Sequence, residues 1–246
     1  MRPRGLEVRS VDSREIEAAM AEPIEETVRK EFNRWADAGK GEGMIEGHVD
    51  VTEQIIDEMG LRPADRVLDL GCGIGWATRM MAPRVPKGLA VGVDLSDEMI
   101  ERARRAESPP NIFYFNAAAS SLPFNSAYFN KVLSIESLYY YPDIPAALNE
   151  VYRVTAPAGR VFFMVNLYME NEGSRHWVEK LAIPAQLLSE DQYRQLFSDA
   201  RFQKIELRRI RDRRPMEVLM KPNSFDSQEQ VRMGIEAGSL LIVAEK

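Results

Sequence analysis

The sequence Val67-Leu68-Asp69-Leu70-Gly71-Cys72-Gly73-Ile74-Gly75-Trp76 decides the fold of this chain. It predicts a buried strand that ends in a glycine turn and leads into a helix. One strand later, Val91-Gly92-Val93-Asp94-Leu95 ends in a single acidic residue. The turn offers backbone N–H groups and a helix N-terminus to a ligand, and the acid offers a carboxylate to ribose hydroxyls. Glycine is needed because a Cβ would obstruct the turn and the approach of the ligand. The two stretches together predict a site for an adenosine.

Short apolar strands alternate with helices along the middle of the chain. The pattern predicts strands at residues 67–70, 89–93, 112–115, 131–135 and 160–165, with helices over 75–82, 96–106 and 144–153. This alternation implies an α/β fold with a parallel sheet covered on both faces. An irregular stretch over 166–188 follows, and then an expected helix at 190–200, strands at 204–211 and 239–244, and a helical segment at 227–236.

Two helices are expected before the first strand. Apolar residues at helical spacing predict one that begins at Ile24. The glycine-rich residues 39–43 predict a flexible break. A second helix is expected from near Asp50, with Glu53 placed as in a capping box, to Gly60. Residues 1 to about 20 are charged and weakly patterned.

Composition excludes several classes of function. The chain has 246 residues, 45% of them apolar, and a net charge of −6, which gives no overall attraction for nucleic acid. Its only cysteine is Cys72, and its two histidines, His48 and His176, lie far apart, so we expect no disulfide within the chain and no metal site. No apolar run approaches the roughly 20 residues of a membrane helix, and no apolar segment follows the basic start. We therefore expect a cytoplasmic protein without a membrane span.

The glycine turn and its neighbours indicate which nucleotide binds. Three alternating glycines and the distance to Asp94 resemble a dinucleotide-binding fingerprint, which is a weak signal alone. However, the third glycine comes one place early, and the bulky Trp76 occupies the expected position. Asp69 lies two residues before the turn, where it would repel a pyrophosphate and attract an ammonium group. The turn therefore favours a nucleoside that carries an amino acid.

Several stretches together resemble the class I S-adenosylmethionine-dependent methyltransferases. Residues 67–75 are similar to motif I of this family, hydrophobic-LDxGCGxG, and residues 91–94 to motif II. Ser121-Leu122-Pro123-Phe124 with residues 129–134 is similar to the LPF…FDxVxS segment, and residues 153–160 are similar to the RVLKPGG element. The likeness covers about Arg66 to Val165 in the family's order. It leans toward the small-molecule branch typified by ubiquinone- and menaquinone-biosynthesis methyltransferases.

The resemblance implies a fold, a domain organisation and an activity. The expected fold is a Rossmann-like, seven-stranded, doubly wound sheet of order 3-2-1-4-5-7-6 with an antiparallel last strand. Residues 1–60 would form an N-terminal helical lid, and residues 61–246 a cofactor-binding domain with a lid insertion near 166–188. The activity would be methyl transfer from S-adenosylmethionine to an oxygen, nitrogen or carbon atom of a small molecule, with S-adenosylhomocysteine as product.

The resemblance also implies cofactor-binding residues. The glycine turn would approach the cofactor through its backbone, Asp69 would bind the ammonium end, and Asp94 would accept hydrogen bonds from the ribose. The full set of expected cofactor-binding residues is Asp69, Gly71, Cys72, Gly73, Asp94, Leu95, Met99, Ala119, Ser120 and Ser134. Leu95 and Met99 would flank the adenine. The chain departs from the family at Ala118, where an Asp often contacts the adenine amino group.

Three residues are candidates for catalysis: Glu136, Tyr140 and His176. Glu136 follows strand four, whose carboxyl end faces the ligand crevice, so it is a candidate base or amine-binding group; alternatively, it caps the next segment or pairs with an arginine. His176, in the 166–188 insertion, is either a proton acceptor or an exposed loop residue. Near the N-terminus, Trp35 is expected to pack between helices, and His48 is a further candidate for the site.

Other interpretations remain open. The arginine-rich residues 208–214 predict a solvated strand edge, or else a site for an acidic substrate. A non-catalytic S-adenosylmethionine-binding regulator would carry the same cofactor residues. A nicotinamide-dependent oxidoreductase is disfavoured by Trp76, and an RNA or protein methyltransferase by the acidic balance of the chain. The sequence predicts neither the acceptor nor the oligomeric state.

Overall fold

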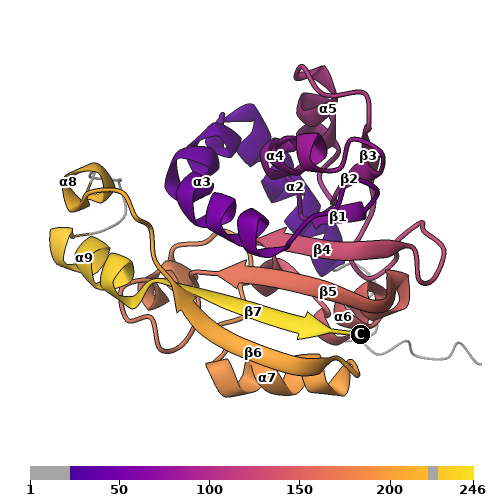
Figure 1. Ribbon diagram of the computed structural model, residues 1–246. Coiled ribbons are helices and arrows are strands. Elements are labelled where there is room, and N and C mark those ends of the chain that lie inside the picture. Colours follow the sequence, from indigo (N-terminus) through magenta and orange to yellow (C-terminus); the bar gives the residue numbers. More distant parts are fainter. Residues whose placement is uncertain (1–22, 221–226) are drawn as a thin grey trace, which may run out of the picture.

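The structure, a computed structural model, describes residues 23–220 and 227–246, so the weakly patterned N-terminal stretch lies outside the described residues. Seven strands form one sheet in the order β3-β2-β1-β4-β5-β7-β6 (Figure 1). They are β1 (Arg66–Leu70), β2 (Leu89–Asp94), β3 (Ile112–Asn116), β4 (Phe129–Ile135), β5 (Thr155–Val165), β6 (Gln203–Ile210) and β7 (Ser239–Glu245). The first five strands pair in parallel, and β7 runs antiparallel to both β5 and β6. The predicted strand order is confirmed.

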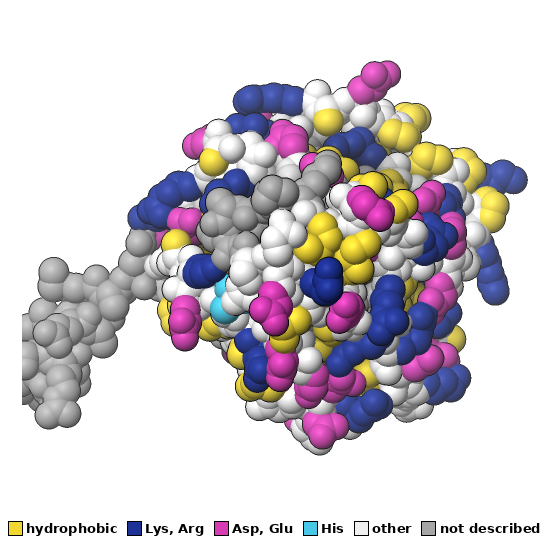
Figure 2. Space-filling view, turned by 90° about the vertical axis from the view of Figure 1, so that its left-hand side faces the viewer, with side chains coloured by type: hydrophobic (Ala, Val, Ile, Leu, Met, Phe, Trp, Pro, Cys, Tyr) yellow, Lys and Arg dark blue, Asp and Glu magenta, His cyan; other side chains and the backbone are white. Residues whose placement is uncertain are grey.

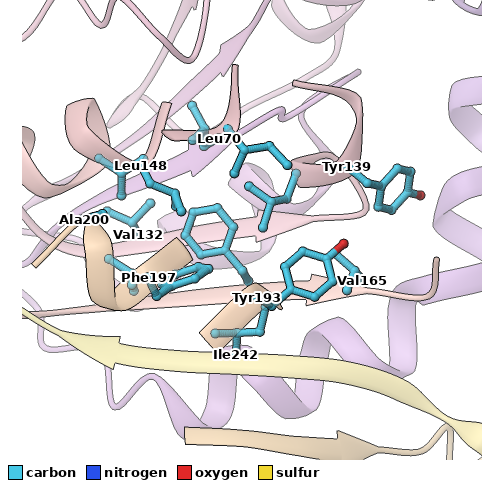
Figure 3. Packing of buried hydrophobic residues seen from close by; sticks show 14 of the residues in the cluster. Leu70, Val132, Tyr139, Leu148, Val165, Tyr193, Phe197, Ala200 and Ile242 are labelled. Atoms are coloured by element: carbon cyan, nitrogen blue, oxygen red, sulfur yellow. The ribbon is translucent and has the colours of Figure 1, made fainter. Parts of the chain in front are cut away.

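Helices cover both faces of the sheet. On one face lie α3 (Lys40–Glu58), α4 (Trp76–Met81) and α5 (Asp97–Arg105), and apolar residues of α3 and α4 pack on Phe162 and Leu241. The other face carries α6 (Ile144–Val154) and α7 (Glu190–Asp199), whose Leu148 and Phe197 pack with Val132 and Ile242 (Figure 3). The central strands are therefore buried on both faces, which explains their continuous apolar sequences.

The N-terminal helices differ from the prediction in one respect. Helix α2 (Ile24–Asp37) is present as expected. The glycine-rich residues 39–43 do not form a flexible break, because only Gly39 leaves the helical conformation (φ +70°) and α3 begins at Lys40. The expected start at Asp50 was therefore wrong, and Asp50 lies in the interior of α3. Its carboxylate accepts hydrogen bonds from Arg213 instead of capping a helix.

The remaining elements are short, apart from one helix. They are three 3-10 turns, η1 (Ala82–Arg84), η2 (Leu138–Tyr140) and η3 (Arg175–Glu179), and the helices α8 (Met216–Leu219) and α9 (Gln228–Ala237). Ser96 caps α5 by accepting the Met99 N–H at 3.0 Å. Within 166–188 only η3 is regular, as the lack of pattern indicated. None of the helices in the described ranges has the length and apolar character needed to cross a bilayer.

The arginine-rich segment lies on β6, at one edge of the sheet, and just beyond it. Most of its guanidinium groups form ion pairs with acids of other elements: Arg208 pairs with Glu58 of α3, Arg209 with Glu190 of α7, and Arg213 with Asp50 at 2.9 Å. The segment thus forms ion pairs with both helical layers. The prediction of a solvated strand edge did not include these ion pairs. On the face that carries α8 and α9, basic and acidic side chains are interspersed (Figure 2).

Candidate active site

A cavity of about 1,010 Å³ opens at the carboxyl ends of β1, β2 and β4. The segments that follow these strands form its floor, and residues of α2, α3, α9 and η3 form its other walls. Ligands bind at this edge in open α/β sheets, because the strand order reverses there. The volume is at the upper end of the range for small-molecule sites, about 300–1,000 Å³, and is large enough for two ligands of modest size.

The glycine turn after β1 is shaped for the close approach of a ligand. The N–H groups of Gly71 and Cys72 both donate to the Val93 carbonyl, at 2.8 and 3.0 Å, which fixes the turn against β2. Gly71 has φ +74°, and a Cβ there would lie 2.4 Å from the Ser137 side chain. Gly73 has φ +52°, and no atom lies within 4 Å of its Cβ position. The turn therefore leaves open space above its backbone that a side chain would fill.

Two buried acids flank this turn. Asp94 accepts the Gly73 N–H and the Ser96 N–H, each at 2.8 Å, and its carboxylate retains lone pairs for further donors. Burial raises the pKa of Asp94. Asp69 is also buried, and burial raises its pKa to about 7 although the Thr78 hydroxyl donates to it at 2.6 Å. Both acids line the cavity, so both can be stabilised in the charged form by a cationic or hydroxyl-bearing ligand.

The next part of the wall is apolar and is set for a flat ring. Leu95 and Met99 line the cavity after β2, together with residues 117–120 after β3. The Asn116 side chain holds these segments together, since its amide donates to the carbonyls of Asp94 and Leu95 at 3.1 and 2.8 Å. The open glycine turn, the two acids and this apolar slot are the groups that S-adenosylmethionine needs for its amino-acid, ribose and adenine parts. The residues present therefore fit this cofactor.

Glu136 lies in the cavity wall at the end of β4 and is 5% exposed. Its backbone has φ +54°, a strained conformation for a residue with a side chain. One carboxylate oxygen accepts the Asn166 N–H, and the other accepts the Tyr139 hydroxyl at 2.8 Å. Burial raises the pKa of Glu136, and the nearby His48 opposes that shift. It therefore contacts Tyr139, Asn166 and His48 of the cavity wall, in contrast to the alternative of a surface arginine.

His48 of α3 faces the same carboxylate. Its Nδ1 lies 2.8 Å from the Met44 carbonyl oxygen and must carry a proton, because a carbonyl only accepts. In the neutral ring the lone pair is then on Nε2, which lies 3.2 Å from the Asn166 side-chain amide and 3.9 Å from Glu136 Oε2. A proton taken up at Nε2 would be stabilised by this buried carboxylate.

Aromatic rings form the wall between the cofactor slot and Glu136. Tyr140 is buried and lines the cavity, and its ring contacts Phe32 and Trp35 of α2 edge to face, with centroids 5.0 and 6.3 Å apart. The indole of Trp35 donates to Glu31 at 2.9 Å. Trp35 thus packs between helices, as predicted, and also lines the cavity. Trp177 of η3 contributes a further ring on the far side.

The structure brings together most of the predicted site residues, with two exceptions. Asp69, Gly71, Cys72, Gly73, Asp94, Leu95, Met99, Ala119, Ser120, Glu136 and Tyr140 all line the cavity. Ser134 and His176 do not. The Ser134 hydroxyl lies 2.7 Å from that of Ser137, beneath the turn, and His176 lies on η3, where the neighbouring Trp177 faces the cavity instead.

Sequence reasoning missed three polar residues of the site. Ser137 and Tyr141 share a 2.7 Å hydrogen bond at the cavity wall, and Asn166 contacts both His48 and Glu136. Ser137 and Tyr141 lie in the same segment as Glu136. Which side chains of this segment enter the cavity depends on the backbone conformation after the strand. Asn166 directly follows β5, and its position at the carboxyl edge is the signal that could have found it.

Comparisons with known families agree with this geometry. The Methyltransferase domain family matches residues 67–159, which run from β1 into β5. The family of protein-L-isoaspartate(D-aspartate) O-methyltransferases matches residues 8–112. Both matches include the glycine turn and Asp94.

Individual relatives extend the likeness. The chain is 37% identical over 112 residues to the demethylmenaquinone methyltransferase of Symbiobacterium thermophilum, covering 44% of this chain and 45% of that protein. It is 28% identical over 161 residues to the 27-O-demethylrifamycin SV methyltransferase of Amycolatopsis mediterranei, covering 58% of this chain and 59% of that protein. The matched region thus spans about half the length of these curated relatives.

A solved structure matches most of the chain. It contains a protein described as a methyltransferase in complex with the Trm112 methyltransferase activator of Haloferax volcanii. The TM-score is 0.80 and the identity 30%, over 87% of this chain and 97% of that one. The likeness therefore includes elements well outside the family motifs.

Proposed function

The chain belongs to the class I S-adenosylmethionine-dependent methyltransferases, and from this premise we propose that it transfers the methyl group of S-adenosylmethionine to a small-molecule acceptor. The observation that carries the proposal is that one cavity holds the acids and glycine turn on one side and the Glu136–His48 pair on the other. The names of two curated relatives, a demethylmenaquinone methyltransferase and a 27-O-demethylrifamycin SV methyltransferase, support a small-molecule acceptor.

The residues on the cofactor side would bind S-adenosylmethionine and orient it. When bound, S-adenosylmethionine supplies a methyl group already activated on a sulfonium, so the protein has to position it and exclude water. Asp94 would accept hydrogen bonds from ribose hydroxyls while it holds Gly73, and Asp69 would pair with the ammonium group. The edge-to-face rings of Phe32, Trp35 and Tyr140 would keep water from the reacting atoms.

On the acceptor side, His48 is the proposed proton acceptor. Its Nε2 lone pair would take the proton of an acceptor hydroxyl or amine that replaces the Asn166 amide. Glu136 would stabilise the resulting imidazolium, since its carboxylate is held 3.9 Å away by Tyr139 and the Asn166 backbone. General-base assistance of this kind is typically worth about 10²–10⁴ in rate. The remaining wall is mostly apolar, which favours an acceptor with an apolar body and one ionisable group.

The two helices before β1 and the 166–188 segment are proposed to form the lid over both ligands. Helix α2 and α3 contribute Phe32, Trp35 and His48 to the cavity, and η3 contributes Trp177. The second half of α3 also packs on the sheet through Ile55 and Ile56, so the lid would move by bending near its N-terminal half.

A screen of phenolic, hydroxylated and amine acceptors for release of S-adenosylhomocysteine tests the activity. With a substrate found, Glu136→Gln and His48→Gln should each lower kcat by about 100-fold or more while cofactor affinity, measured by calorimetry, stays within about twofold. Cofactor binding with no release from any acceptor would favour the non-catalytic binding protein instead. Unchanged kcat in both variants would remove the proposed proton acceptor.

We also propose that the chain works with a protein partner of the activator type. The support is the Haloferax volcanii relative, whose structure was solved in complex with the Trm112 methyltransferase activator and which matches 87% of this chain. Calorimetric titration of that activator into this chain tests the proposal directly. Measurable 1:1 binding is expected, and its absence at protein concentrations near 100 times a typical transient Kd of about 1 µM would contradict it.

A further inference from the structure

We propose that Asn171 determines acceptor specificity, because its side-chain oxygen is placed to accept a hydrogen bond from a second O–H or N–H group of the methyl acceptor. This inference rests on the proposed function, since it assigns a further contact to the same ligand. It narrows the acceptor class to compounds that carry two donor groups, one that gives its proton to His48 and one that binds Asn171.

The side-chain amide of Asn171 has a fixed orientation. Its NH2 group donates to the Asn166 carbonyl at 2.9 Å. Because a carbonyl only accepts, this contact fixes the nitrogen on that side and leaves Oδ1 on the other. Asn171 is 2% exposed, and its Oδ1 has no hydrogen-bond partner among the residues that the structure describes. A buried acceptor without a donor is unfavourable, so this oxygen would gain from a donor supplied by a ligand.

The oxygen faces helix α9 at a position that lacks a side chain. Asn171 and Gly234 of α9 both line the cavity. Outside α9, Asn171 Oδ1 is the only described atom near a Cβ built at Gly234, at 4.0 Å. The two segments otherwise pack closely, since a Cβ at Gly173 would lie 2.6 Å from Gly234 Cα. Gly234 thus leaves the space of about one methyl group in front of the oxygen.

Helix α9 covers this oxygen but is lightly packed. None of its ten residues is buried, although it follows α8 along the cavity and leads into β7 (Figure 1). A small shift of such a helix costs few apolar contacts. A hydroxyl or amine that enters the space at Gly234 would therefore reach Asn171 Oδ1 and satisfy it.

Asn166 connects this oxygen to the proposed proton acceptor. Its side-chain amide lies 3.2 Å from His48 Nε2, and its backbone carbonyl accepts the Asn171 amide. His48, Asn166 and Asn171 all line the cavity, so His48 and Asn171 lie on one wall with Asn166 between them. An acceptor with a single polar group would leave Asn171 Oδ1 unpaired. A site of this kind discriminates against analogues that lack the second donor.

The test uses the full chain with S-adenosylhomocysteine bound and compares phenol with the three dihydroxybenzenes in NMR titrations. In the wild type, at least one dihydroxybenzene should bind at least about tenfold more tightly than phenol, because it supplies the second donor. Two equivalent hydroxyls alone would give a ratio of about twofold, so a ratio no larger than this for all three compounds would overturn the proposal.

Two variants locate the preference. Gly234→Ala fills the space in front of the oxygen and should reduce the ratio to about twofold or less, while the chain melts at or above the wild type because alanine favours a helix. Asn171→Ala removes the oxygen and should reduce the ratio equally; the Asn166 carbonyl then keeps its hydrogen bond from the Ser174 hydroxyl, at 2.7 Å. Glu236→Ala is the matched control, since Glu236 is an exposed residue of α9 outside the cavity lining, and its ratio should stay within about twofold of the wild type.

The outcomes separate this contact from the activity. Retention of the wild-type preference by Asn171→Ala or by Gly234→Ala would overturn the proposal, because the second hydroxyl would then bind elsewhere. Loss of the preference in Glu236→Ala as well would also overturn it, since a general disturbance of α9 would explain the result. Failure of the wild type to bind S-adenosylhomocysteine would count against the proposed function and not against Asn171.

Discussion

Asp69 is the residue where burial and charge conflict most clearly. Because burial raises its pKa from 3.8 to about 7, the ionised form is unfavourable in the folded protein. The stability that the protonated carboxyl contributes is therefore fully present below about pH 3.8 and is lost as the pH rises through about 7. Asp69→Asn should therefore stabilise the ligand-free protein at about pH 8, by at most about 4 kcal/mol, and much less at about pH 4.5.

Urea unfolding of both proteins at the two pH values measures this difference. The same variant should lose affinity for the cofactor, because an amide cannot pair with an ammonium group. Equal unfolding free energies for Asp69→Asn and the wild type at the higher pH would show that burial of the ionised carboxylate does not destabilise the ligand-free protein.

Substitution of Asp94 should lower the affinity for the cofactor more than substitution of any other single residue. Its carboxylate holds the Gly73 N–H and faces the cavity, so Asp94→Ala removes both the ribose acceptor and a support of the glycine turn. We expect cofactor affinity to fall by about 1.5–3 kcal/mol, roughly 10- to 150-fold, in calorimetry. Glu101→Ala on the exposed side of α5 is the control and should bind normally. An unchanged affinity in Asp94→Ala would exclude the proposed ribose contact.

At the scale of whole elements, the strands were the most predictable. Their apolar stretches are short and bounded by turn residues, and every predicted strand is present. The largest difference is in β5, which begins at Thr155 and not at the expected residue 160. Helix α3 was the main error. Gly41, Gly43 and Gly47 are poor helix formers, so local preference indicated a break, but packing of Val51 and Ile55 on the sheet maintains the helix.

This conflict makes the two first glycines of α3 informative. A Cβ at Gly43 would meet no atom within 4 Å, so Gly43→Ala should stabilise the protein by about 0.5–1 kcal/mol. A Cβ at Gly41 would lie 2.8 Å from the Ile74 side chain, so Gly41→Ala should gain less or lose stability. Thermal unfolding of both variants measures the contrast. If Gly43→Ala melts below the wild type, the helix does not begin at Lys40.

At the scale of the whole molecule, the sequence predicted the cofactor half of the cavity better than the acceptor half. The cofactor residues that line the cavity lie between Asp69 and Ser120 in recognisable motifs, whereas the acceptor half combines His48, Glu136, Asn166 and Trp177 from distant parts of the chain. Their meeting depends on how α3 and the 166–188 segment pack over the sheet. No local pattern encodes that packing, which explains why the sequence indicated His176 in the 166–188 segment, whereas its neighbour Trp177 lines the cavity.

Because distant elements share one cavity, ligand binding should order them together. S-adenosylhomocysteine at about 100 times its Kd should stabilise the folded state by about 2.7 kcal/mol and raise the melting temperature. Hydrogen exchange should slow in residues 117–120, which the cofactor would touch, and also in α2, whose Phe32 and Trp35 pack over the same space. Exchange in α7 should not change, since that helix lines no part of the cavity. Protection of residues 117–120 without protection of α2 would mean that the N-terminal helices do not close over the cofactor.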